Sequence, residues 1–267
     1  MIRRWESVSE YIADFRARGL DKGYHGGFDS DLGVNTHECV KRCTEGDPSI
    51  VGAVTKAVDK IQADHFVEEP RMRNQRHVMG SRVLVPDYLA GSPFNMNRRV
   101  KLLSPIQHVS IYVAVAFCCN VSAEQMLKRG ITILGLVEQL QARQVNVDLY
   151  LMSDTNGHTD GDLHQIIRIE NRPLDLSTSG FALAHPSFAR CITYAMSGAI
   201  DGFNGACPSS WHKMTWEKYN QEFMPKLLGM GPGDIYIQEP RHFDPLINDP
   251  EGWLNEKLTQ LTKGYQP

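Results

Sequence analysis

The sequence contains no long apolar run, so no membrane-spanning helix is expected. The longest uncharged apolar stretch, residues 109–121, is shorter than the roughly 20 residues that cross a bilayer. The chain becomes polar within its first six residues, so no secretory signal is expected either. These absences predict a cytoplasmic location and no membrane partner.

The chain also lacks the short motifs of several enzyme classes. It has no Gly-x-Gly-x-x-Gly after a strand, no Walker loop and no Gly-x-Ser-x-Gly elbow, which disfavours common nicotinamide, ATP and serine enzymes. The six cysteines form no Cys-x-x-Cys pair, so we expect reduced thiols and no structural zinc site.

Charge of one sign is not in large excess. The 267 residues carry 28 Lys and Arg against 31 Asp and Glu, a formal net charge of −3. This balance gives no whole-chain reason to expect nucleic acid or an anionic membrane as a partner. Any electrostatic contact must come from local patches.

The strongest pattern in the chain predicts a strand, a helix and a second strand. Residues 109–119 are rich in β-branched side chains, as in a buried strand. Ser122 and Gln125 match a capping box that begins a helix over residues 123–143. Residues 145–152 form the next strand. Such a βαβ unit makes its two strands parallel and its crossover right-handed.

Further elements follow this unit. We expect a polar loop over residues 154–164, an antiparallel strand over 165–169 and a mostly helical segment over 173–198. Within that segment, residues 191–196 are compatible with either a helix or a core strand. A short strand over 234–238 and a helix over 253–261 complete the fold.

The chain divides into three parts by pattern. Residues 1–69 form a small helical N-terminal region, residues 70–105 a basic connector interrupted by prolines, and residues 106–267 the α/β domain. The connector is expected to be packed, because it contains apolar side chains to bury: Val83, Leu84, Val85, Tyr88 and Leu89.

The order of these elements over residues 106–240 resembles the von Willebrand factor A-type fold. Such domains often hold a metal with Asp-x-Ser-x-Ser after the first strand, and the matching positions here are Asn120, Ser122 and Glu124. The resemblance implies an α/β fold with a mostly parallel sheet flanked by helices. Asn120 is a weaker metal ligand than aspartate, whereas Glu124 could restore one charge.

Several segments also resemble a family of uncharacterised tailed-phage and prophage proteins. The similar segments are residues 85–96, 128–131, 173–176 and 181–186. The resemblance implies a phage setting, in the host cytoplasm or in the virion, and no known activity.

The carboxyl edge of the predicted sheet is the first candidate site. Parallel strands joined by a helix end at the same edge, where open α/β sheets bind ligands. Carboxylates there suit one divalent cation, Mg²⁺ or Ca²⁺ rather than Zn²⁺. The alternative is an ordinary solvent-exposed hairpin loop. The candidate metal ligands are Asn120, Ser122, Glu124, Asp154, His158, Asp160, Asp162 and His164.

The connector is the second candidate site. Its cations suit phosphate groups and its aromatic residues could stack on bases, unless the charges point in unrelated directions. The candidate phosphate-binding residues are Arg71, Arg73, Arg76, Arg82, Arg98, Arg99 and Lys101.

Three functional hypotheses follow. The first is a non-catalytic binding or assembly module of a phage or prophage, which engages a protein partner, or a second copy of itself, through the carboxyl edge of the sheet and the connector. The second is a metal-dependent enzyme that acts on nucleic acid or a nucleotide. The third is a single-stranded DNA-binding protein without catalysis.

Overall fold

The chain divides into a main unit and a small unit. The computed structural model describes residues 1–22, 34–62, 72–101, 108–116, 121–143, 145–157, 162–170, 175–200, 205–207, 216–240 and 244–264. Met1–Asp64 and His108–Pro267 together form the main unit, and His65–Gln107 form the small unit.

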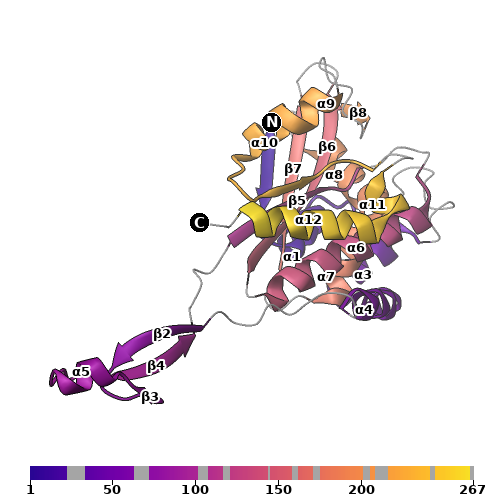
Figure 1. Cartoon of the computed structure of the whole chain (residues 1–267). Helices are drawn as coiled ribbons and strands as arrows, with labels where there is room; N and C mark the ends of the chain where they lie inside the picture. The colour runs from indigo at the N-terminus through magenta and orange to yellow at the C-terminus, as the bar shows by residue number, and fades with distance from the viewer. Residues whose placement is uncertain are drawn as a thin grey trace. The chain divides into compact units, whose positions relative to one another are not determined.

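A mixed sheet lies at the centre of the main unit (Figure 1). Its strands have the order β1-β7-β6-β5-β9, and β8 pairs with the end of β6. The pairs β1–β7, β5–β6 and β5–β9 are parallel, whereas β6–β7 and β6–β8 are antiparallel. The strands are β1 (Ile2–Trp5), β5 (His108–Ala114), β6 (Asn146–Gly157), β7 (Asp162–Ile169), β8 (Gly205–Cys207) and β9 (Ile235–Ile237).

The predicted βαβ unit is confirmed. Helix α6 (Ala123–Ala142) connects β5 to the parallel strand β6. Ser122 caps this helix: its hydroxyl accepts a hydrogen bond from the Gln125 N–H, and the Gln125 side chain accepts one from the Ser122 N–H. Two of the N–H groups that a helix start leaves open are therefore satisfied by the sequence motif itself.

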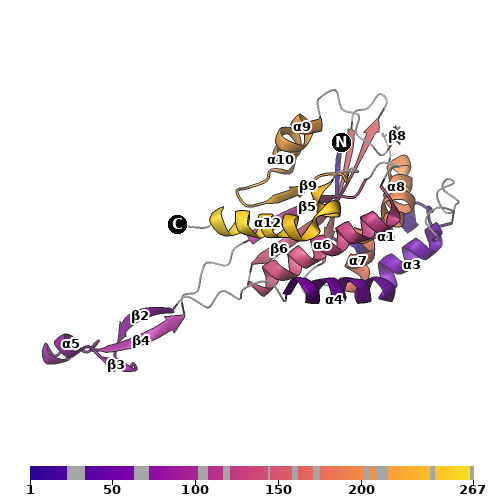
Figure 2. The same ribbon diagram turned by 45° about the vertical axis from the view of Figure 1, so that its right-hand side comes forward.

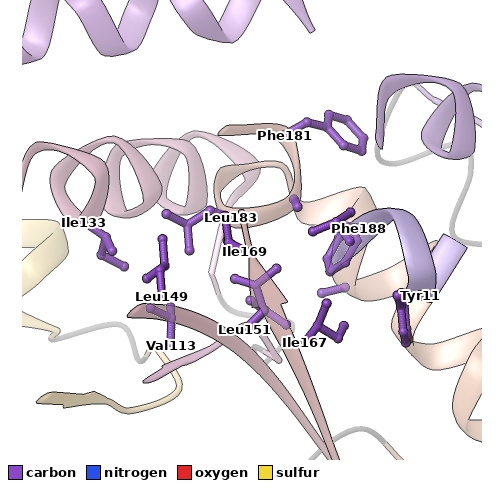
Figure 3. Packing of buried hydrophobic residues seen from close by; sticks show 14 of the residues in the cluster. Tyr11, Val113, Ile133, Leu149, Leu151, Ile167, Ile169, Phe181, Leu183 and Phe188 are labelled. Atoms are coloured by element: carbon purple, nitrogen blue, oxygen red, sulfur yellow. The ribbon is translucent and has the colours of Figure 1, made fainter. Parts of the chain in front are cut away.

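One face of the sheet carries the main hydrophobic core. Alternate strand residues point to this face, and Figure 3 shows Leu149, Leu151 and Ile167 packed towards Leu183 and Phe188 of the covering helices. The elements of this layer, besides α6, are α1 (Val8–Ala17), α3 (Thr36–Glu45), α4 (Pro48–Gln62), α7 (Leu176–Ala184), η1 (Phe188–Thr193), α8 (Tyr194–Ala199), α11 (Pro245–Asn248) and α12 (Pro250–Gly264). Of these, α12 lies along α6 (Figure 2).

The opposite face of the sheet is covered by a smaller layer. Here α9 (Trp216–Lys218), the π-helix η2 (Tyr219–Phe223) and α10 (Met224–Leu228) follow one another. Tyr219, Met224 and Leu228 pack against Tyr112, Met152 and Ile166 of the strands. The sheet is thus flanked by helices on both faces, as the α/β prediction requires.

The N-terminal region differs from its prediction as a separate helical part. Residues 2–5 form β1, which pairs with β7 and brings the following helices into the main core. Ile2 and Arg3 are exposed on this edge strand, so its short sequence lacks the apolar alternation that marks a half-buried strand. The boundary at residue 69 therefore does not separate a domain.

The small unit contains a second sheet. Strands β2 (Met72–His77) and β3 (Arg82–Val83) each pair with β4 (Met96–Lys101) in antiparallel fashion, and α5 (Val85–Leu89) lies between β3 and β4 in the chain. The predicted connector is therefore a folded unit of its own. Within the described residues, no helix is both long and apolar enough to cross a bilayer.

Asp148 joins three strands at the amino end of β6. Its Oδ2 lies 2.7 Å from Nε2 of His108 on β5, and its Oδ1 accepts a 2.9 Å hydrogen bond from Arg168 on β7. Burial alone would raise the pKa of this carboxyl, but the bonds from His108 and Arg168 outweigh burial and lower the pKa below its usual value. The negative form is therefore the one that the fold stabilises.

We expect Asp148→Asn to lower the free energy of unfolding by about 1 kcal/mol at neutral pH, because His108 and Arg168 are partly exposed. A carboxyl whose pKa is lowered by folding contributes its full stability above the pKa that it has in the unfolded chain, about 3.9. This contribution is lost as the pH falls through the lower pKa of the folded protein. The difference between wild type and variant should thus vanish in acid. Urea titrations at neutral and strongly acidic pH measure it, with exposed Glu222→Gln as the control. A difference that is unchanged in acid would contradict this assignment.

Candidate functional site

The two ligands that the structure brings together from the first candidate site are Asp154 and His164. They lie directly opposite each other on β6 and β7, and His164 Nδ1 is 2.8 Å from Asp154 Oδ1. Because a carboxylate can only accept, the Nδ1 of His164 carries the proton. The prediction of a polar surface loop is wrong for both residues: they lie within strands, and they are only 2% and 4% exposed.

Tyr219 completes this buried group from the covering layer. Its hydroxyl donates a 3.1 Å hydrogen bond to Asp154 Oδ2, so both carboxylate oxygens are bonded. Burial and then the nearby Asp154 charge raise the pKa of Tyr219, which keeps its hydroxyl a donor. Tyr219 begins the π-helix η2, a conformation that often marks functional positions. Here it places a tyrosine over the sheet.

Polar side chains are also buried on the other face of the same strand ends. Gln165 accepts a hydrogen bond from Tyr11 and donates to the Thr193 carbonyl and the Ser197 hydroxyl. Ser153 donates to Thr193 as well. These bonds connect α1, η1 and α8 to β6 and β7. A buried network with its groups satisfied fixes the packing of a fold, and we assign this one a structural role.

The remaining predicted metal ligands do not join Asp154 and His164. Ser122 is engaged in the helix cap, and Glu124 is exposed. Asn120, His158 and Asp160 lie outside the described residues. Within the described ranges, no three His, Cys, Asp or Glu side chains, those of Asp154, Asp162 and His164 included, gather into a group that could hold a metal. The divalent cation remains a prediction from the sequence alone.

A buried arginine near the same edge was not predicted. Arg129 on α6 is fully buried, and its Nη2 donates a 2.9 Å hydrogen bond to the Gln238 carbonyl after β9. Burial lowers its pKa to about 10, while the charges of Asp244 and Glu239 act in the opposite direction. It therefore remains a cation at neutral pH.

The sequence did contain a signal for Arg129. The inner face of α6 includes Met126 and Ile133, and Arg129 stands between them at helical spacing. A charged residue at a core position of an amphipathic helix points to a buried counter-charge. The counter-charges are too distant in sequence to be identified without the fold, since they follow β9.

The small unit contrasts with these buried groups, because it exposes its apolar side chains. No side chain that the structure describes in residues 74–99 is buried. The connector was predicted to bury Val83, Val85, Tyr88 and Leu89, but they are 45%, 59%, 63% and 78% exposed. That prediction is wrong because three short strands and one turn of helix contribute too little surface to enclose a core.

The exposed apolar residues of the small unit include a stripe on α5. Val85, Tyr88 and Leu89 are spaced at i, i+3 and i+4, which places them on one side of the helix. Three further apolar residues are at least half exposed nearby: Val78, Met79 and Phe94. Exposed apolar patches in soluble proteins commonly mark interaction surfaces.

Three of the predicted phosphate-binding arginines lie on one face of the small sheet. On the central strand β4, Asn97 pairs with Arg76 of β2 on one side and with Arg82 of β3 on the other. Arg99 is two residues after Asn97 on β4, so its side chain belongs to the same face. Asp87 partly neutralises Arg76 at 3.4 Å. Arg98 belongs to the other face of the sheet by the same alternation.

The other basic residues can be placed only partly. Arg73 and Lys101 take part in the β2–β4 ladder, and Arg71 lies outside the described residues. Over the full sequence of residues 65–107, seven Lys and Arg stand against three Asp and Glu, a formal charge of +4 in a chain of net charge −3. The small unit thus combines exposed apolar side chains with positive charge.

Comparison with known proteins gives one family. A family model described as "Domain of unknown function (DUF7192)" matches residues 2–228. The matched segment includes the small unit and the strands up to β8, and it ends at the last residue of α10. No curated protein and no solved structure matches the chain.

Proposed function

Since the chain belongs to the DUF7192 family, whose function is unknown, we propose its role from the surface that it exposes. It is a binding or assembly module that docks on a protein partner through the small unit. The observation that carries this proposal is a three-stranded sheet without a single buried side chain among its described residues 74–99.

Such a sheet gains its core from a partner. Isolated small sheets are marginal in water unless an apolar face is covered. Fully burying a Val or Leu side chain contributes about 1.5–3 kcal/mol, so covering Val85 and Leu89 would stabilise both the unit and the complex. A short helix that lays its apolar side into a groove is a common mode of peptide recognition.

A protein partner fits these side chains better than a nucleic acid does. Nucleic-acid binding uses cations and aromatic rings, and the small unit has both. The exposed apolar side chains of the unit are, however, mainly aliphatic or methionine, including Val78, Met79, Val83, Val85 and Leu89. These side chains cannot stack on bases, whereas they pack well in the centre of a protein interface.

The small unit, rather than the carboxyl edge of the sheet, is the surface that we assign to the partner. Asp154 and His164 at that edge are buried and bonded to each other. The likeness of residues 85–96 to tailed-phage proteins falls on α5 and the turn after it, so the setting that we propose is a phage or prophage programme. The partner should offer an apolar groove with acidic side chains around it.

Site-specific cross-linking tests the proposal. A photoreactive amino acid at Tyr88, in the full chain and in the cells that naturally contain it, should yield a discrete cross-linked protein. The same photoreactive chain kept in the dark is the control and should yield none. A cross-link from position 88 to nucleic acid, or to nothing, would refute the proposal.

The double substitution Val85→Ser and Leu89→Ser should weaken binding to the cross-linked partner by about 10–100-fold. The loss corresponds to about 1.4–2.7 kcal/mol of apolar burial at the interface. Ile2→Thr, which changes an exposed apolar residue of the main unit, is the control and should leave the affinity unchanged. Calorimetric titration with the purified partner measures the affinity of the wild type, the double serine variant and the Ile2→Thr control. Equal affinities for the wild type and the double variant would place the interface elsewhere.

A further inference from the structure

Charge is segregated between the two units. Residues 65–107 carry a formal charge of +4, and the whole chain carries −3, so the remainder carries −7. Exposed carboxylates are spread over several elements of the main unit, including Glu10, Glu217, Glu222 and Glu256. The main unit is therefore net acidic and the small unit net basic, and opposite net charges speed and orient the encounter of two proteins.

Contact between two small units is disfavoured by the same charges. Both edge strands of the small sheet carry arginine, with Arg76 on β2 and Arg82 on β3. Charged side chains on edge strands oppose pairing between sheets. Two units of charge +4 would also repel each other at moderate ionic strength. An interface made of two identical small units is thus the less favourable arrangement.

We propose that the partner is a second copy of this chain, and that the small unit of one copy docks on the main unit of the next. This inference rests on the proposed function and names the partner. In such a head-to-tail contact the two surfaces differ, so a pair of copies still has one free small unit and one free main-unit surface. Repetition of the contact gives a closed ring or an open chain of copies.

Sedimentation of the full chain tests self-association directly. At about 50 mM salt, the measured mass should exceed that of a monomer. At about 500 mM salt, the mass should fall towards that of the monomer, because the charges are screened. Val85→Ser with Leu89→Ser should weaken self-association at least tenfold. Arg82→Glu with Arg99→Glu should do the same by reversing charge, which keeps the test valid if the serine variant misfolds.

Mixing distinguishes the head-to-tail contact from a symmetric one. A serine-variant copy has a defective small unit and an intact main unit, so it should accept a wild-type small unit. An excess of this variant should therefore shorten wild-type assemblies and accumulate complexes with one copy of each. If wild type forms dimers that the variant cannot enter, the head-to-tail contact is wrong.

The remaining outcomes separate this inference from the proposed function. In one outcome, the wild-type chain stays monomeric at all salt concentrations but cross-links from position 88 to a different protein. This result would refute self-association as the partner contact and would leave the proposed docking function intact. A monomer that cross-links to no protein overturns both. Assembly that grows stronger with salt would show that opposite charge does not select the partner.

Discussion

Arg129→Ala should lower the free energy of unfolding by about 3–5 kcal/mol, the range for removing one member of a buried charged group. The reason is what remains: Asp244 and Glu239 would stay almost completely buried without their cation. Burial already raises the pKa of Asp244. The Gln238 carbonyl would also lose its hydrogen bond from Nη2. Urea unfolding at neutral pH, followed by circular dichroism, measures the loss.

Arg143→Ala is the matched control for this prediction. Arg143 stands at the carboxyl end of the same helix with an exposed side chain, so its removal should change stability by no more than about 0.5 kcal/mol. If Arg129→Ala and Arg143→Ala had similar small effects, the buried guanidinium would contribute nothing net to the fold. The segment after β9 would then be held by apolar contacts alone.

Two glycines inside helices should respond to alanine with opposite signs. A Cβ added at Gly130 on α6 would overlap the Cβ and backbone Cα of Ala184 on α7. Alanine improves helix propensity by about 1 kcal/mol over glycine, but separating two packed helices costs more. We expect Gly130→Ala to destabilise the protein by about 2–3 kcal/mol net, at the upper end of the usual cost of overpacking.

Gly52 on α4 provides the comparison for Gly130. A Cβ there meets no atom within 4 Å, and the residue is exposed. Gly52→Ala should therefore stabilise the protein by about 0.5–1 kcal/mol through propensity alone. Thermal unfolding of both variants measures these two changes in stability, which should have opposite signs. A stabilised Gly130→Ala would mean that α6 and α7 can move apart without loss.

The α/β class of the fold could be predicted because its signals are local. The buried strand over residues 109–119, the capping box at Ser122 and Gln125, and the second strand at 145–152 each lie within a short stretch of chain. Together they required a parallel pair with a covering helix, and β5, α6 and β6 have that arrangement. The relation to von Willebrand factor A-type domains and to phage proteins stays a prediction.

The site was predicted less well, because burial depends on distant segments. Asp154 and His164 are polar residues near a turn, and such residues usually face solvent. They are buried here because Tyr219 covers them and donates a hydrogen bond to Asp154, which lies 65 residues earlier in the chain. Val85 and Leu89 were misjudged in the opposite sense, since an apolar side chain is buried only where enough other surface surrounds it.

What the sequence determined by itself is therefore a set of local features: the strand–helix–strand unit that begins at residue 109, the capping box of its helix, and the concentration of positive charge between residues 71 and 101. The tertiary structure decided which of these groups meet. It placed β1 beside β7, enclosed Arg129 and Asp154, and left the apolar side of α5 uncovered. The physical reason is that hydrogen bonding within a helix or turn depends on near neighbours in the chain, whereas burial depends on surfaces that come together only when the whole chain has folded.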